Sequence, residues 1–148
     1  MSKVQTRDIF HSTNPPSVSD EVAITSLLHA YSSVLASRSL SDLLNIYTSD
    51  GVLMAPGYLP AVGIEALKTS YERIFSTIKL EIEFRIDEIV VMDGGEWAFA
   101  RTTAEGMKFW LQKGTGERHH NQEIFICRKV DGQWKIARYC FSSIKPAA

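Results

Sequence analysis

Arg101 and Glu105 are two charged residues whose spacing could place them together on one face of a β-strand. They lie four residues apart in a stretch that is predicted to be a strand, so their side chains point the same way at a separation of roughly 13 Å. Because this distance is too long for an ion pair in an unbent sheet, each charge needs a partner of its own. Glu105 could then act as an acid or base, while Arg101 could hold an anion or a carbonyl group. The alternative is that the two charges neutralise each other in a structural role.

Two adjacent histidines, His119 and His120, form a second candidate. Neighbouring residues of a strand point to opposite faces of a sheet, so the two rings cannot bind one metal ion together, and we expect no metal site. His120 alone could shuttle a proton, because an imidazole titrates near neutral pH. The alternative is a hydrogen-bonded structural histidine near the rim of a pocket.

The elements that must position these residues can be predicted from the spacing of apolar side chains. Apolar residues recur at helical steps over three segments, residues 20–35, 40–47 and 64–78, with a short strand at residues 52–54. The rest of the chain is strand-like, because residues 80–86 alternate strictly between apolar and charged side chains. Three more strands are predicted over residues 96–111, 118–130 and 133–144, each preceded by a short glycine-containing turn. Such turns favour an antiparallel meander, so the fold class is α+β.

The composition indicates one domain in a chain of 148 residues with a formal net charge of -1. We predict an N-terminal flexible arm over residues 1–18 and one domain over residues 19–145. The scattered basic residues exclude a phosphate-binding face, so nucleic acid is not expected as a partner. The chain has no apolar stretch long enough to span a bilayer and no secretory signal, so we expect a cytoplasmic protein that does not bind membranes. Cys127 and Cys140 are predicted to be free thiols.

Three segments resemble a known superfamily. They are residues 47–54 (YTSDGVLM), residues 62–67 (VGIEAL) and residues 130–138 (VDGQWKIAR). Together with the order of the predicted elements, they resemble the nuclear transport factor 2-like superfamily, and most closely its SnoaL-like and ketosteroid-isomerase-like branch. The resemblance covers residues 19–143. It implies a cone-like fold in which three N-terminal helices pack on a strongly curved, mainly antiparallel sheet and enclose a pocket.

The resemblance also suggests where catalytic groups should lie. Ketosteroid isomerases carry their catalytic base directly before a proline after the first strand, and here that position is Ala55. The usual isomerase route of proton abstraction is therefore not expected. Tyr31 precedes Asp50 by the spacing at which those isomerases carry a tyrosine that stabilises an oxyanion, so Tyr31 is a candidate donor. Tyr139 is a similar candidate, and for both the alternative is a tyrosine packed in the core.

Counting back from the predicted Asp131-Gly132 turn, in the manner of these isomerases, assigns the faces of the last two strands. Val130 then pairs with Gln133, and Ile124 pairs with Tyr139. The concave set is His120, Gln122, Ile124, Ile126, Ala137, Tyr139 and Phe141. The convex set includes Phe125, Trp134 and Ile136, whose apolar surface favours a homodimer. A one-residue bulge would exchange the two sets beyond it.

The same resemblance places Phe99, Arg101, Thr103 and Glu105 on the concave side of the preceding strand. The predicted catalytic residues are Glu105, His120 and Tyr31, and the predicted ligand-binding residues are Arg101, Thr103, Gln122, Tyr139, Phe141, Met54 and Phe109. We therefore expect a pocket for a small, largely apolar carbonyl compound, with isomerisation, cyclisation or dehydration by acid–base chemistry and no cofactor. The alternative is a ligand-binding or dimerisation module without turnover.

Overall fold

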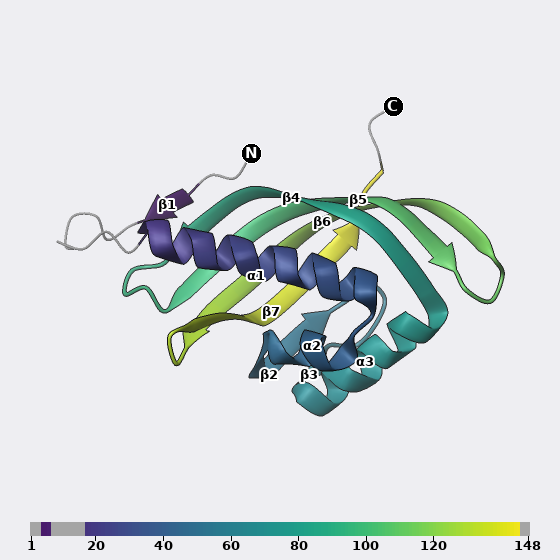
Figure 1. The fold of residues 1–148 in the computed structure, drawn as a ribbon, viewed down its shortest axis with the longest axis horizontal. Coiled ribbons are helices and arrows are strands. Elements are labelled where there is room, and N and C mark those ends of the chain that lie inside the picture. The colour runs from purple at the N-terminus through teal and green to yellow at the C-terminus, as the bar shows by residue number, and fades with distance from the viewer. Residues whose placement is uncertain (1–3, 7–16, 146–148) are drawn as a thin grey trace.

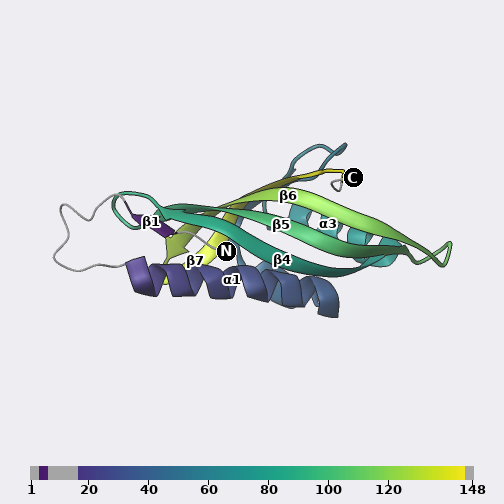
Figure 2. The same ribbon diagram turned by 90° about the horizontal axis from the view of Figure 1, so that it is seen from above.

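A long, curved sheet forms one layer of the molecule, and helix α1 lies across one of its faces (Figures 1 and 2). The structure is a computed structural model and describes residues 4–6 and 17–145. In chain order its elements are β1 (Val4–Thr6), α1 (Ser17–Ser37), α2 (Leu40–Asn45), β2 (Tyr47–Met54), β3 (Ala61–Val62), α3 (Ile64–Thr77), β4 (Ile78–Val91), β5 (Trp97–Trp110), β6 (Thr115–Val130) and β7 (Gln133–Ser143). The predicted α+β class and the three helices are confirmed.

The sheet has the strand order β1-β4-β5-β6-β7-β2-β3 among the described residues. Strands β4 to β7 form the predicted antiparallel meander, while β1 pairs in parallel with β4 and β2 pairs in parallel with β7. Helices α2 and α3 lie at one end of the sheet beside β2 and β3 (Figure 1). This arrangement matches the predicted cone-like fold.

The predicted arm over residues 1–18 lies mostly outside the described residues. Its described part includes Val4–Thr6, which pairs with residues 89–91 of β4. Helix α1 begins at Ser17, two residues before the predicted start of the domain. The first turn of α1 is held to the far end of the sheet, because Asp20 is buried and accepts hydrogen bonds from Lys129 Nζ and Trp134 Nε1, both at 3.0 Å.

The hydrophobic core lies between α1 and the inner face of the sheet. Ile24, Leu28 and Tyr31 of α1 are buried against sheet residues that include Phe125 and Ile136. Burial of this much apolar surface is the main stabilising contribution in a domain of this size.

A β-bulge at Ala137 changes the predicted pairing of β6 with β7. The pairing follows the prediction from the turn as far as Val130 and Gln133, but Cys127 pairs with Ile136 and Ile126 then pairs with Arg138. Beyond the bulge the partners are displaced by one residue, so Ile124 pairs with Cys140 and not with Tyr139. The bulge reverses the faces of β7 beyond Ala137, so Tyr139 and Phe141 face inward as predicted. Strand β6 has no bulge, and its inward side chains are the odd-numbered ones, contrary to the prediction.

The predicted dimer surface is wrong in its residues, because the helices cover the face of the sheet that carries them. Phe125 and Ile136 are 0% exposed and Trp134 is 6% exposed, and all three belong to the core under the helices. The apolar residues on the outer face of β6 are instead Ile124 and Ile126, which are 42% and 37% exposed.

Candidate functional site

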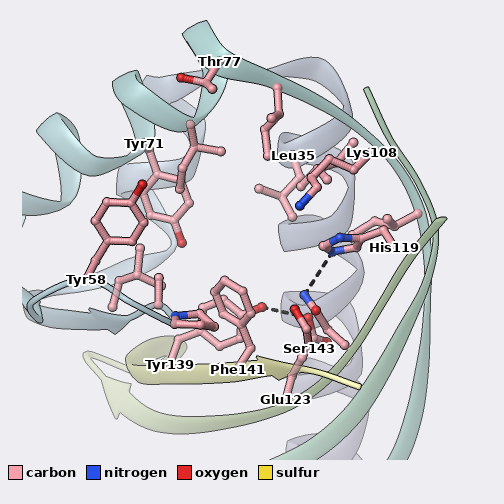
Figure 3. A pocket seen from close by; sticks show the side chains of 18 of the residues that line it. Leu35, Tyr58, Tyr71, Thr77, Lys108, His119, Glu123, Tyr139, Phe141 and Ser143 are labelled. Carbon is pink, nitrogen blue, oxygen red and sulfur yellow. Dashed lines mark hydrogen bonds between the residues drawn. The ribbon is translucent and has the colours of Figure 1, made fainter. Parts of the chain in front are cut away.

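A pocket of about 270 Å³ lies between the helices and the inner face of the sheet (Figure 3). Much of its lining is apolar and comes from α1, α3 and β4, including Leu35, Ile74, Ile78, Leu80 and Ile82. Polar groups enter this lining from β5, β6 and β7. A small, mostly apolar cavity with a few convergent polar groups is typical of a site for a small organic molecule.

Three polar residues of β6 line the pocket at alternate positions. They are His119, Asn121 and Glu123, and strand geometry directs all three to the same face of the sheet. Figure 3 shows His119 and Glu123 projecting from the sheet into the pocket. Among the described residues, no group of three or more His, Cys, Asp or Glu side chains is arranged to hold a metal ion.

Glu123 is a buried carboxyl group with two hydrogen-bond donors. Thr102 Oγ1 donates to Glu123 Oε1 at 2.6 Å, and the Tyr139 hydroxyl donates to Glu123 Oε2 at 2.8 Å. Burial raises the pKa of Glu123 from 4.5 to about 7, while the two donors act in the opposite direction by stabilising the anion. Near neutral pH this carboxyl group can therefore both release and accept a proton.

Three tyrosine hydroxyl groups form a chain that ends beside the pocket. Tyr47 and Tyr71 are joined by a hydrogen bond of 2.7 Å, and so are Tyr71 and Tyr31. Burial raises the pKa of each of these phenols well above its ordinary value, so all three stay protonated near neutral pH. Two hydrogen bonds use two of the three protons. When Tyr47 donates to Tyr71 and Tyr71 donates to Tyr31, the Tyr31 proton is left to donate into the pocket.

His119 and Asn121 form a neutral polar pair beside Glu123. Asn121 Nδ2 lies 3.0 Å from His119 Nε2. Burial and the nearby Lys108 lower the pKa of His119, so a neutral ring can accept the hydrogen bond from the amide. Asn121 Oδ1 is buried and has no hydrogen-bond partner among the described residues, so it can accept a hydrogen bond from a bound molecule.

Comparison with known proteins relates this fold and pocket to a family. The model of the SnoaL-like domain matches residues 28–139. The chain belongs to the SnoaL-like domain family. A search of curated proteins found no significant match.

Solved structures of other members of this fold agree with the SnoaL-like assignment. A ketosteroid isomerase-like protein from Erwinia carotovora atroseptica SCRI1043 is 34% identical, with a TM-score of 0.79 over 84% of this chain and 96% of that chain. A protein described as a candidate scytalone dehydratase from Novosphingobium aromaticivorans DSM 12444 is 19% identical, with a TM-score of 0.74 and 86% coverage of each chain. A candidate dehydratase from Streptomyces avermitilis is 14% identical, with a TM-score of 0.73 over 87% of this chain and 99% of that chain. The last two similarities show the fold alone.

The SnoaL-like pocket contains three of the residues predicted from the sequence, Tyr31, Tyr139 and Phe141. Ala55 also lines it, so the position of the usual isomerase base is correctly located and carries no carboxylate. Met54 and Phe109 are not part of the lining, and Met54 is exposed. These two residues were wrongly expected to form its apolar wall.

Arg101, Thr103 and Glu105 lie on the outer face of the sheet, which corrects their predicted orientation. The inward residues of this part of β5 are Ala98, Ala100, Thr102 and Ala104. Arg101 is exposed and its Nε donates to Glu88 Oε1 at 3.0 Å, while the Thr103 hydroxyl donates to Asp87 Oδ2 at 2.7 Å. A bulge between Ile86 and Glu88 of β4 places these acidic partners on the outer face.

His120 and Gln122 also lie away from the pocket. His120 Nε2 is 3.1 Å from Glu105 Oε1, and Gln122 Nε2 donates to Ser142 Oγ at 3.1 Å. Polar residues of the lining that the sequence did not predict are Tyr71, Lys108, His119, Asn121 and Glu123. Thr102, which donates a hydrogen bond to Glu123, was not predicted either. Both faces of β6 carry apolar residues in its second half, so alternation alone contained no signal that would select the odd-numbered set.

Within the described residues, no helix is long and apolar enough to cross a membrane.

Proposed function

We propose that this SnoaL-like domain is a cofactor-independent acid–base enzyme in which Glu123 moves a proton of a small, largely apolar carbonyl compound. The observation that supports this most directly is a buried carboxyl group, with a pKa of about 7, facing a pocket. Tyr31 lies in the same lining and can donate a hydrogen bond to an oxygen that gains negative charge. Acid–base catalysis requires a group with this pKa at the working pH.

The proposed reaction begins with removal of a proton from the carbon beside the carbonyl group. The Glu123 carboxylate accepts the proton, and the electron pair of the broken C–H bond forms an enolate whose oxygen accepts a hydrogen bond from Tyr31. Glu123 then returns the proton to a different carbon in an isomerisation, or to a departing hydroxyl group in a dehydration. Thr102 and Tyr139 hold the carboxyl group in place through their hydrogen bonds.

The names of similar proteins agree with this reaction class. One relative is called ketosteroid isomerase-like, and two proteins of the same fold are described as candidate dehydratases. This agreement supports the class of chemistry, and the substrate is a separate question.

Deuterium exchange into 2-tetralone tests the proposal without knowledge of the natural substrate. This fused-ring ketone has acidic protons beside its carbonyl group, and ¹H NMR in D₂O follows their loss. We expect the protein to accelerate exchange, Glu123→Gln to reduce the acceleration about 100-fold or more, and Tyr31→Phe to reduce it about tenfold. Glu105→Gln is the matched control, because Glu105 is exposed on the outer face.

Unchanged exchange in Glu123→Gln, with the variant folded, would rule out the proposed role of Glu123. If neither the wild type nor the variant accelerates exchange, the alternative of a ligand-binding module without turnover is favoured.

We also propose that two copies of the chain associate through the outer face of the sheet. Ile124 and Ile126 are exposed there side by side on β6, and Phe99 of the neighbouring strand pairs directly with Ile126. A second copy would cover these apolar side chains, while charged residues such as Arg101 and Glu105 would remain around them.

A further inference from the structure

Lys108 is a charged group of the pocket that the proposed proton transfer does not use. It lies on β5, and Figure 3 shows its ammonium group directed into the pocket. No carboxylate among the described residues lies within 4.0 Å of Lys108 Nζ, whereas other lysines and arginines of the sheet do have such partners. Glu117, which pairs with Lys108 across the strands, accepts a hydrogen bond from Trp110 Nε1 at 2.6 Å, and this bond and the nearby Lys108 lower the pKa of Glu117. A cation that lines a largely apolar pocket without an acidic partner is well placed to bind an anion.

The register of the sheet separates Lys108 from Glu123. Lys108 pairs with Glu117, and Thr102 pairs with Glu123. The two pairs are therefore six residues apart along β5, which is roughly 20 Å at the usual rise of a strand. The two side chains enter the pocket at different places along the sheet, with His119 between them. Lys108 must therefore contact a different part of any bound molecule.

The charges around Lys108 also favour an anion. His119 lies between Lys108 and Glu123 on the same face, and its lowered pKa makes it neutral near pH 7. The other cation of the lining is Arg73 of α3, whose guanidinium carbon lies 4.0 Å from the centre of the Tyr58 ring. Glu123 is the one acidic residue among the lining residues of the described chain. The lining at the end of the pocket that contains Lys108 therefore carries a cation and no acidic side chain, since Glu117 lies outside the lining and is hydrogen-bonded to Trp110.

We infer that the pocket takes an organic acid, a molecule with an apolar body whose carboxylate binds Lys108 at the end remote from Glu123. This inference rests on the proposed function for the role of Glu123 and adds the class of substrate. The apolar residues Leu35, Leu80 and Ile82 would contact the body of the molecule between its two ends. Lys108 would bind the substrate before the reaction and in the transition state alike, so it acts in binding and not in proton transfer.

A matched pair of probes tests this inference. The probes are 2-naphthoate and its uncharged methyl ester, and isothermal titration calorimetry gives their dissociation constants. The wild type should bind 2-naphthoate more tightly than the ester, and Lys108→Met should weaken 2-naphthoate binding about tenfold while leaving the ester unchanged, because a hydrogen bond between charged groups is lost. Lys113→Met is the control, since Lys113 lies near the same Trp110 ring but is not part of the lining.

The inference is overturned if wild-type protein fails to bind 2-naphthoate or binds the ester at least as tightly. It is also overturned if Lys108→Met binds 2-naphthoate as tightly as the wild type does, while its thermal unfolding midpoint shows that the variant is folded. Lys108→Gln provides a second variant with a polar, uncharged side chain. The exchange assay with Glu123→Gln is independent of these measurements. Loss of anion preference with intact Glu123-dependent exchange would reject the organic acid alone, and the opposite pair of results would reject the role of Glu123 alone.

Discussion

The Glu123 carboxyl group shows how surroundings determine the chemistry of a single residue. Glu105 and Glu123 have the same side chain, but Glu105 is exposed beside His120 and Glu123 is buried under α1. Burial disfavours the charged form of Glu123, and the hydrogen bonds from Thr102 and Tyr139 only partly offset this effect. The buried site therefore favours the protonated form of Glu123, and ionisation of this carboxyl group destabilises the folded protein.

Glu123 should therefore make stability depend on pH. Because its pKa is about 7 in the folded protein and 4.5 is its ordinary value, the folded state binds more protons between these pH values than the unfolded state. The contribution of Glu123 to the free energy of unfolding is greatest below pH 4.5. It falls by about 3 kcal/mol in total as the pH rises through 7. Urea unfolding of the wild type and Glu123→Gln at a series of pH values measures the difference. Parallel pH profiles for the two proteins would contradict the prediction.

At the scale of elements, the site depends on close contact between β4 and β5 at Gly106. Gly106 pairs with Ile82 of β4 and with His119 of β6, both of which line the pocket. A Cβ atom at this position would lie 2.0 Å from the carbonyl oxygen of Glu81, and the residue has a φ of 156°. No side chain larger than hydrogen fits there without moving β4.

Gly106→Ala should destabilise the protein by about 3 kcal/mol or more, because a methyl group would overlap backbone atoms that cannot move aside independently. Gly114→Ala is the matched control. Gly114 has a φ of 69° in a turn, but a Cβ atom there meets nothing within 4 Å, so the cost should be about 1 kcal/mol. Urea unfolding measures both variants. Equal losses in the free energy of unfolding for the two substitutions would show that the close contact with β4 does not determine the effect of Gly106→Ala.

At the scale of the whole molecule, the two faces of the sheet have different tasks. The inner face is covered by helices and carries the pocket, while the outer face carries ion pairs around exposed apolar residues. The sheet is thus both the floor of the candidate site and the surface through which we propose that two copies meet. Association through the outer face would leave the pocket of each copy on the opposite side.

Ile126→Arg should convert the proposed homodimer to a monomer, because it places a charge in the centre of the apolar contact. Size-exclusion chromatography with light scattering measures the mass of the wild type and the variant. Val22→Arg is the control, since Val22 is 60% exposed on α1, away from the sheet face. A monomeric wild type, or a dimer that survives Ile126→Arg, would argue against this interface.

The organisation of the fold could be predicted largely from local patterns. Residues 20–35 and 64–78 have the apolar periodicity of helices, and they form most of α1 and α3. The glycine-containing turns after residues 92, 112 and 130 predicted the meander of β4 to β7, because tight turns join antiparallel neighbours. Each of these patterns lies within a short segment of the chain, so the helices and turns that it predicts do not depend on how distant segments pack.

Part of the candidate site was predicted from the sequence, because Tyr31, Tyr139 and Phe141 line the pocket as expected. Tyr31 and Ala55 were located correctly, because one lies on a helix and the other follows a short strand. Arg101, Glu105 and His120 were assigned to the wrong face, because the choice between the two faces of β5 and β6 came from the resemblance and not from the apolar pattern. That pattern does not distinguish the faces, since the inner side of β5 carries mainly alanines and both faces of β6 carry apolar residues.

The sequence by itself determined a SnoaL-like cone with a pocket and without the usual isomerase base. Only the tertiary structure decided which carboxyl group faces that pocket. The helices cover the face of the sheet that carries Thr102 of β5 and Glu123 of β6, and leave Glu105 on the other face. Which face is covered depends on packing between the helices and the sheet, so Glu123 replaced Glu105 as the candidate acid or base for a reason that acts between elements and not within one.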